Sequence, residues 1–423
     1  MHNSSIFASL PGLVVLLALV ITAAYFGAAL IAAFLLLLFL LCAAACLWSC
    51  SILDKTSVSI GDGQTACHAG DTMPLTLHVR SRSVFPLIWL DVILPFGETP
   101  LLRREEDAPG QTFTFITDKP FYGLRERFVW LLWQQEIACE ETLLALRRGV
   151  VTLSRACLQA GDGLGMAAAQ RCAELDRPVR LLIYPRIVPV DVQPFLRLIT
   201  DAETGARGQT EDIALLRSSR PYQHGDSMKR INWRYLAMAG RMEVNQYETI
   251  TPGCITFFLD LYSFRYLETH TADGDYKETR VAVHHQALED MLSLVASCIR
   301  ALHERSQRFA LVVPGYAEHE PVLIKPSGSD GAYDQAMEAL AEIDYRGQAI
   351  LLPGDDIRRM HRKLGSIHLC SYTSASRLAE SLDALSCHRL RTIACMRSDS
   401  APAAGECTLL EDLVLSGGEG GGA

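Results

Sequence analysis

The sequence has no charged residue before Asp54 and no lysine or arginine before Lys55. This apolar stretch is about twice as long as the ~20 residues that one helix needs to cross a bilayer. The lack of a basic residue ahead of it, together with its length, argues against a cleaved signal peptide. We therefore expect a transmembrane helical hairpin over residues 1–54, with helices at about Leu10–Ala24 and Leu30–Trp48.

The chain also lacks the short motifs that mark a metal, redox or nucleotide site. It contains no C-x-x-C pair, no H-E-x-x-H and no Walker motif, and the histidines from His270 to His388 show no ligand spacing. Gly161, Gly163 and Gly165 have G-x-G-x-G spacing, which is typical of a glycine-rich turn and not of a dinucleotide loop. We therefore expect no cofactor, and a metal-dependent enzyme is the least favoured hypothesis.

Charge and cysteine content narrow the class of protein further. The 39 Lys and Arg residues are outnumbered by 48 Asp and Glu residues, and the formal net charge is −9. An acidic chain without a strongly basic run is a poor ligand for a phosphate backbone, so nucleic-acid binding is disfavoured. The 13 cysteines are irregularly spaced and do not resemble a small disulfide scaffold. Those beyond the apolar stretch fit a reducing compartment.

The distribution of positive charge predicts the orientation in the membrane. Lys55, Arg80 and Arg82 are the first basic residues, and the positive-inside rule places such residues in the cytoplasm. Two spans return the chain to the side on which it began. We therefore expect a protein of the inner (cytoplasmic) membrane that contacts the lipid bilayer through two spans and has its soluble part in the cytoplasm.

Between residues 55 and 195 the pattern changes to short alternating runs. Leu75, Leu77 and Val79 alternate with polar residues, which is the period of a half-buried strand. Gly, Pro and Asp separate the runs at short spacing, so the pattern predicts a small antiparallel, all-β, immunoglobulin-like sandwich. Further strand-like runs are Ile88–Leu94, Thr112–Thr117, Arg127–Trp133, Gly149–Leu153 and Val179–Tyr184.

The densest group of candidate functional residues is the stretch RPYQHGDSMKRINW, from Arg220 to Trp233. A turn is expected at Gly225–Asp226, with Asp226 capping a short helix that ends at Gly240. A cation, an amide and a large ring then lie within one helical turn, a group suited either to docking a partner or to bracing two domains. The candidate residues of this segment are Arg220, Tyr222, Gly225, Asp226, Arg230, Asn232 and Trp233.

This stretch resembles the string R-x-Y-x-x-G-D-x-x-R-x-I-x-W of the family called domain of unknown function fifty-eight (DUF-58). The match includes Arg220, Tyr222, Gly225, Asp226, Ile231 and Trp233, but Lys229 stands where the family has arginine and Arg230 follows one position later. RRGVVTL at residues 147–153 and LLIYPRIVPV at residues 181–190 resemble the family's strands on either side of a DPFGL-like turn. That turn reads DGLGM here, at Asp162–Met166, without the Pro and Phe.

Residues 251–400 alternate between strand-like and helical runs. Cys254–Leu259 is continuously apolar, and an apolar stripe from Leu288 to Leu302 predicts a helix after it. Alternation of this kind predicts an α/β, Rossmann-like domain with a mainly parallel sheet. Further strands are expected at Phe309–Val313, Ala349–Leu352, Ile367–Tyr372 and Leu390–Met396, and further helices at Tyr333–Ile343, Asp355–Leu364 and Ala375–Leu385.

The family resemblance implies that this domain is similar to a von Willebrand factor A domain. Such domains often bind a divalent metal through D-x-S-x-S after the first strand. Asp260 is in place, but Tyr262 and Phe264 replace the two serines. One carboxylate is too few ligands for Mg²⁺, so we expect a degenerate site in which Asp260 caps a turn or helix.

Two classes of function remain open, and in the first the chain is a membrane-anchored, non-enzymatic adaptor. The family resemblance implies that the adaptor works with a MoxR-type AAA+ ATPase, or its client protein, in chaperone-like or complex-maturation work. The alternative is a structural scaffold of the cell envelope that needs no ATPase. The expected organisation is a hairpin (1–54), a β-sandwich (55–195), a motif segment linking the domains (196–250), a von Willebrand A-like domain (251–400) and a flexible tail (401–423).

Overall fold

The computed structural model divides into two compact units, Met1–Arg186 and Ile187–Ala423. The described residues are 10–83, 86–107, 112, 121–131, 134–161, 168–197, 211–249, 254–271, 277–352, 357, 364–383, 390–398 and 406–415. Three expected features lie outside the described residues: most of Thr112–Thr117, the turn Asp162–Met166, and most of the helix Asp355–Leu364.

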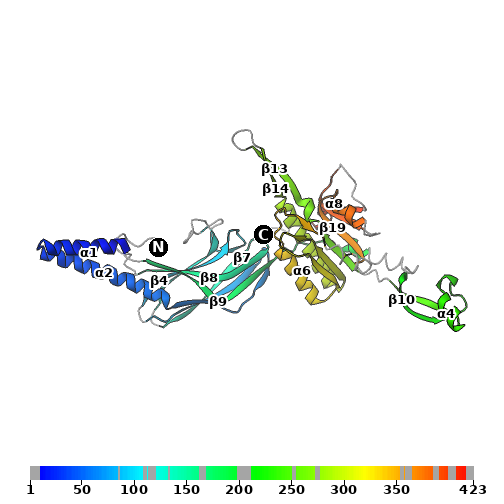
Figure 1. Cartoon of the computed structure of the whole chain (residues 1–423), viewed down its shortest axis with the longest axis horizontal. Coiled ribbons are helices and arrows are strands. Elements are labelled where there is room, and N and C mark those ends of the chain that lie inside the picture. Colours follow the sequence, from blue (N-terminus) through cyan, green and yellow to red (C-terminus); the bar gives the residue numbers. More distant parts are fainter. Residues whose placement is uncertain are drawn as a thin grey trace, which may run out of the picture. The chain divides into compact units, whose positions relative to one another are not determined.

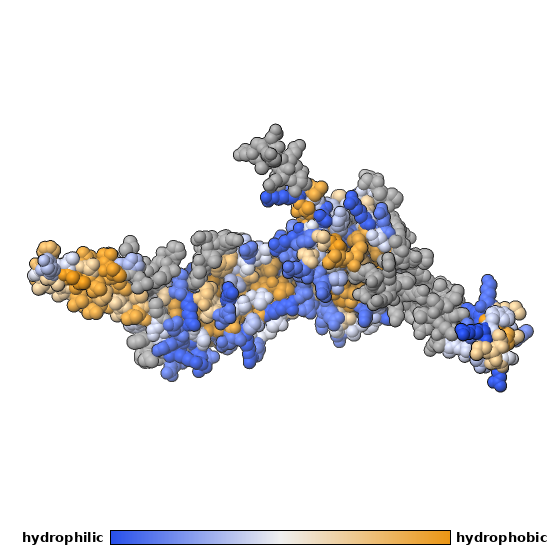
Figure 2. All heavy atoms as spheres, viewed as in Figure 1, coloured by the Kyte–Doolittle hydropathy of each residue, from blue (hydrophilic) through white to orange (hydrophobic). Residues whose placement is uncertain are grey.

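The first unit begins with two apolar helices, α1 (Leu10–Tyr25) and α2 (Ala29–Asp54). The chain turns back between them, and the two helices lie side by side (Figure 1). The stretch Ala29–Trp48 is long and apolar enough to cross a membrane, and only 11% of its most apolar window is buried. Figure 2 shows the apolar surface that covers both helices. The shorter apolar helix Pro11–Tyr25 does not by itself reach the length of a span.

After α2 the chain forms two β-sheets that pack on one core. Leu77, Leu90 and Val151 come from different strands and are fully buried in a single apolar cluster. The four-stranded sheet has the order β1 (Thr56–Ile60), β3 (Thr72–Ser81), β7 (Glu136–Ala145), β5 (Leu102–Arg104). The five-stranded sheet has the order β2 (Ala66–His68), β9 (Ala168–Tyr184), β8 (Gly149–Gly161), β4 (Leu87–Gly97), β6 (Tyr122–Leu131).

The predicted β-sandwich is therefore confirmed at the level of two packed sheets, and the immunoglobulin-like subtype stays a prediction. One detail of the prediction is wrong: β2 pairs with β9 in parallel, so the sandwich is not wholly antiparallel. Cys157 and Cys172 face each other on β8 and β9 and form a disulfide. Such bonds are typical of oxidising compartments, so this one weighs against the reducing compartment that the cysteine content suggested.

The second unit is built on a six-stranded sheet in the order β17 (Val322–Ser327), β15 (Arg308–Val313), β12 (Cys254–Leu259), β19 (Ser366–Thr373), β20 (Leu390–Met396), β21 (Glu406–Leu409). The ladders from β15 to β21 are parallel, and β17 is an antiparallel edge. Every residue of β12 is buried, as its unbroken apolar run predicts. Among the described residues after β12, the helices of this unit are α5 (His285–Glu304), α6 (Asp330–Glu342), α8 (Arg377–Asp383) and α9 (Leu410–Leu413).

Three expectations about this unit are corrected. The predicted strand Ala349–Leu352 is only β18 (Ile350–Leu351), which pairs with β16 (Gly315–Tyr316) outside the main sheet. A hairpin of β13 (Arg265–Thr271) and β14 (Lys277–Val283) interrupts the path from β12 to α5. The flexible tail was expected from residue 401, but β21 pairs with β20 and α9 follows it. An edge strand needs no continuous apolar run, and β21 has the sequence ECTL. The sequence pattern therefore did not predict it.

The boundary expected at residue 195 is also displaced. Phe195 is 2% exposed, and its ring packs on Phe257 and His368 of the second unit. The backbone N–H of Val188 donates to Ser297 Oγ at 2.9 Å. Residues 187–195 therefore belong to the α/β unit, because the apolar ring of Phe195 is buried in that core.

Candidate functional site

The Arg220–Trp233 stretch lies between two antiparallel strands, β10 (Glu211–Pro221) and β11 (Glu243–Thr249). Arg220 holds Asp226 through two hydrogen bonds, Nη1 to Oδ2 at 2.9 Å and Nη2 to Oδ1 at 2.6 Å. Asp226 Oδ2 also accepts from the backbone N–H of Gln223. Because the Arg220 guanidinium and this N–H stabilise the carboxylate, the pKa of Asp226 is lowered. The hydrogen bonds between Arg220 and Asp226 thus close a turn that contains Gly225, whose φ angle is 109°.

The expected helix is present in a modified form. Met228–Arg230 form a single 3₁₀ turn, and α4 (Trp233–Ala239) follows it. Asn232 caps α4 by accepting from the backbone N–H of Tyr235 at 3.0 Å, and Gly240 ends it at φ 64°. The prediction that Asp226 caps the helix is wrong, because its carboxylate is occupied by Arg220 and Gln223.

Apart from Tyr222, the aromatic and sulfur-containing side chains of this segment face solvent. Trp233 is 59% exposed and Met238 is 81% exposed, and Met228, Tyr235 and Met242 are exposed as well. Only Ile231 and Val244 are buried among the described side chains of residues 218–245, and they pair with each other across the hairpin. Tyr222 and Arg230 are half-buried. We call the five exposed side chains, Met228, Trp233, Tyr235, Met238 and Met242, the apolar tip.

Asp260 lies at a different place, the carboxyl end of the parallel sheet. From β12 the chain passes through α5 to β15 on one side, and from β19 it passes through α8 to β20 on the other. The carboxyl ends of β12 and β19 therefore flank the position where connections diverge, which is where open α/β sheets bind ligands. Asp260 follows β12 directly, and the loop after β19 brings Ser376 to it.

Hydrogen bonds within the chain occupy both oxygens of Asp260. Ser376 Oγ donates to Oδ2, and the backbone N–H of Ser263 donates to Oδ1 at 3.3 Å. Asp260 thus caps the short 3₁₀ helix Leu261–Phe264, so the expected capping role is confirmed. The guanidinium carbons of Arg265 and Arg377 lie 4.9 and 6.0 Å from the ring centre of Tyr262. Two cations and one occupied carboxylate do not fit the divalent metal that the family resemblance implies.

Asp260 is also a source of pH-dependent stability. Burial raises the pKa of its carboxyl group to about 6, against an ordinary value of 3.8. A carboxyl group with a raised pKa in the folded state destabilises the fold as pH rises from about 4 to about 7, here by about 3 kcal/mol. Asp260→Asn should therefore gain stability relative to the natural chain over this range. Urea unfolding at pH 4 and pH 7 measures it, and an equal difference at both values would contradict the prediction.

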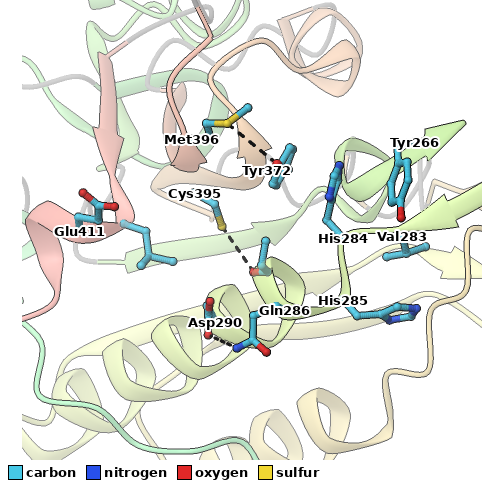
Figure 3. Close-up of a pocket in the computed structure, with 12 residues that line it drawn as sticks. Tyr266, Val283, His284, His285, Gln286, Asp290, Tyr372, Cys395, Met396 and Glu411 are labelled. Atoms are coloured by element: carbon cyan, nitrogen blue, oxygen red, sulfur yellow. Dashed lines mark hydrogen bonds between the residues drawn. The ribbon is translucent and has the colours of Figure 1, made fainter. Parts of the chain in front are cut away.

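The same edge carries a cavity of about 610 Å³ between the ends of β19 and β20 and the start of α5 (Figure 3). The ring of His284 is stacked between Tyr266 and Tyr372, with ring centres 4.4 and 4.2 Å away. Cys395 lines the cavity, but burial raises the pKa of its thiol to about 12, so it is not a thiolate nucleophile near neutral pH. The size and aromatic lining suit binding, and no paired nucleophile and base are present among the described lining residues.

The stack of Tyr266, His284 and Tyr372 was not predicted from the sequence. Tyr266 and His284 flank the β13–β14 hairpin, which the sequence did not reveal, and Tyr372 comes from a strand about ninety positions later. The signal available in the sequence was the adjacent pair His284–His285. Two neighbouring residues at the start of a helix point in different directions, so one of the two rings is directed away from the helix.

One further group of potential metal ligands lies in the described part of the sandwich: Glu126, Cys139 and Glu141. Arg104 lies among them, with Nη1 2.8 Å from Glu126 and Nε 2.9 Å from Glu141. The guanidinium supplies the positive charge that a metal ion would bring. This group is therefore an internal ion network of the sandwich.

Comparisons with known proteins give neither a matching family model nor a matching curated relative. Among solved structures, the CARDB domain of a Pyrococcus furiosus protein, solved in complex with two metal ions, shows a TM-score of 0.18 at 10% identity, covering 30% of this chain and 91% of that one. A cohesin module of a Clostridium perfringens glycoside hydrolase gives 0.20 at 12% identity, covering 30% and 96%. Escherichia coli α-2-macroglobulin gives 0.19 at 16% identity, covering 32% of this chain and 10% of that one. Scores this low carry no conclusion about function.

Proposed function

We propose that the chain is a membrane-anchored, non-enzymatic interaction protein whose apolar tip docks a partner protein. The observation that carries this proposal is the exposure of Trp233 on a segment whose backbone is fixed by the Arg220–Asp226 pair and the Asn232 cap. A bracing role would bury the tryptophan against a domain, as Phe195 is buried. A large exposed ring on an ordered turn is instead a typical interface anchor.

The charge around the tip defines the kind of surface that it fits. Residues 218–245 contain five basic residues and two acidic ones, and both acidic side chains are held within the segment, by Arg220 and by Ser219. The partner surface should therefore be acidic around an apolar pocket. Methionine side chains are flexible and adapt to such pockets.

The resemblance to the DUF-58 family supports a MoxR-type AAA+ ATPase as this partner, and it supports a von Willebrand A-like assignment for the α/β unit. It also supports two membrane spans, α1 and α2. An ATPase partner requires the cytoplasmic side, which the first basic residues favour; the Cys157–Cys172 bond is the observation against that side. Labelling of intact cells with an impermeant reagent, at a cysteine introduced in place of Met238, shows on which side of the membrane the soluble part lies.

Crosslinking in intact membranes tests the proposal directly. A photo-crosslinking residue at Met238 should capture an AAA+ ATPase, whereas the same residue at Arg147, an exposed position of the sandwich, should not. Capture of the ATPase from Arg147 and not from Met238 would favour a scaffold that acts through the sandwich. Recovery of no ATPase from either position, with purified ATPase also failing to bind the full chain in detergent, would refute the partner.

A further inference from the structure

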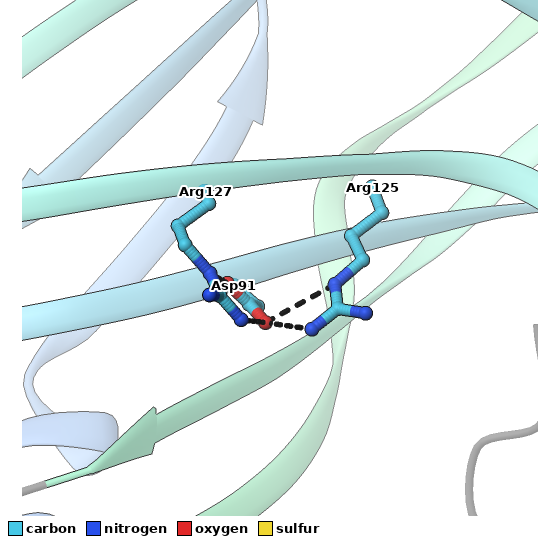
Figure 4. A network of polar contacts seen from close by, with 3 residues as sticks. All are labelled: Asp91, Arg125 and Arg127. Atoms are coloured by element: carbon cyan, nitrogen blue, oxygen red, sulfur yellow. Dashed lines mark hydrogen bonds and ion pairs between the residues drawn. The ribbon is translucent and has the colours of Figure 1, made fainter. Parts of the chain in front are cut away.

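The outer face of the five-stranded sheet carries a cluster of charges that the docking proposal does not use. Asp91 on β4 is completely buried, and both neighbouring arginines of β6 bind it (Figure 4). Arg127 donates from Nε to Oδ1 at 2.6 Å and from Nη2 to Oδ2 at 2.8 Å. Arg125 donates to Oδ2 from Nε at 3.1 Å and also from Nη2. The two arginines lower the pKa of Asp91, so its charge is present at neutral pH.

This cluster has more positive charge than the buried carboxylate needs. One guanidinium neutralises one carboxylate, and the second leaves the cluster with a net charge of +1. Arg125 and Arg127 are 42% and 58% exposed, and each uses two N–H groups on Asp91. The Nη1 group of each guanidinium makes none of these bonds to Asp91, and guanidinium N–H groups are suitable donors to a phosphate group.

A tryptophan ring packs against the guanidinium group of Arg127. The guanidinium carbon of Arg127 lies 5.5 Å from the ring centre of Trp89. The same ring lies against Gly161, where an added Cβ would be 2.5 Å from the ring. The first glycine of the G-x-G-x-G motif therefore provides room for Trp89, which in turn positions the arginine.

The cluster lies near the end of α2, the helix that can cross a membrane. Trp48 Nε1 in α2 donates to the carbonyl of Pro86 at 3.3 Å, and β4 begins at the next residue. At about 3.3 Å per residue, Trp89 lies about 10 Å and Asp91 about 17 Å along the strand from that point. Arg171 of β9 also binds the carbonyl of Leu53, near the end of α2. This end of the sheet therefore faces the bilayer surface wherever α2 spans it.

The strand next to the cluster exposes apolar side chains at the same end. Val129 pairs with Trp89 across the ladder and is 59% exposed, and Trp130 is 65% exposed. Trp130 has φ 58°, in the left-handed region that a bulky residue rarely adopts. Tryptophan beside arginine is typical of the membrane–water interface, where the ring lies at the level of the headgroups.

We propose that Arg125 and Arg127 bind the phosphate group of an anionic phospholipid, with Trp130 and Val129 lying in the interface beside it. This site rests on α2 spanning the membrane and is independent of partner docking at the apolar tip. The sandwich is then held against the bilayer by a lipid as well as by the helices.

Native mass spectrometry of the full chain, released from nanodiscs, tests this site. The natural chain should retain phosphatidylglycerol about tenfold more than phosphatidylcholine, a difference of about 1.4 kcal/mol, because both lipids carry a phosphate but the net positive cluster repels the choline cation of phosphatidylcholine. Arg125→Gln/Arg127→Gln should abolish this preference. Arg147→Gln, which removes an exposed arginine at the opposite end of the strands, should keep it within twofold.

Two further arms separate lipid binding from a folding defect and from binding of free phosphate. Asp91→Asn/Arg125→Gln/Arg127→Gln removes the whole ion cluster, so it avoids leaving a buried charge unpaired and should fold while losing the lipid preference. Inorganic phosphate is titrated against the chain in detergent alone. Retention of phosphatidylglycerol by the triple variant, equal loss in Arg147→Gln, or phosphate binding as tight as lipid binding would each overturn the proposal.

Discussion

Replacing Trp233 by alanine is expected to weaken binding of the purified ATPase partner by about 30-fold or more, while the thermal midpoint of the chain changes little. A central exposed tryptophan of an interface typically contributes about 2–4 kcal/mol to binding. Trp233 is 59% exposed and begins a helix capped by Asn232, so its truncation removes little packing from the folded chain. Titration of labelled full-length chain in nanodiscs with the ATPase measures the affinity, and calorimetry measures the midpoint.

A second tryptophan provides the matched control for this experiment. Trp130 has a similar exposed fraction, 65%, but lies in the sandwich. Trp130→Ala should leave ATPase affinity unchanged within about twofold, because its ring takes no part in the interface. If Trp233→Ala instead lowered the midpoint strongly, the segment would brace the domains and the docking proposal would fail.

Replacing Gly365 by alanine is expected to destabilise the α/β unit by about 3 kcal/mol or more. Gly365 has φ 68°, and an added Cβ would overlap the carbonyl oxygen of Cys254. That carbonyl belongs to β12, and Gly365 immediately precedes β19, which pairs with β12 from Ser366 onward. Relief of the overlap must separate these two central strands, and their carboxyl ends hold Asp260 and Ser376 together.

Gly331→Ala is the control for this prediction. Gly331 lies in α6 with no atom within 4 Å of an added Cβ, so alanine should be neutral or should stabilise the chain by up to about 1 kcal/mol. Urea unfolding followed by far-ultraviolet circular dichroism compares both variants. A similar small effect for the two would show that β19 can shift without cost, contrary to the expectation.

Several features followed from the sequence because they depend on local pattern. The uncharged run predicted the two apolar helices, the period of two predicted β3, and the apolar stripe from Leu288 to Leu302 predicted α5. Gly240 was correctly placed at the end of α4, since few other residues adopt a left-handed cap readily. The capping role of Asp260 also followed from its neighbours, because Tyr262 and Phe264 removed the metal pattern.

Other features were decided by partners that the local pattern did not reveal. Asp226 was expected to cap a helix, but Arg220 across the turn takes its carboxylate, and Asn232 becomes the cap. Ser376 reaches Asp260 only because β19 inserts beside β12 in the sheet. Strand β21 was interpreted as tail since an edge strand needs no apolar run, and the Asp91 cluster is formed by register between β4 and β6. Periodicity in the sequence reports which face of an element is buried; which side chains then meet depends on strand order and register, and these are fixed only when the sheets assemble.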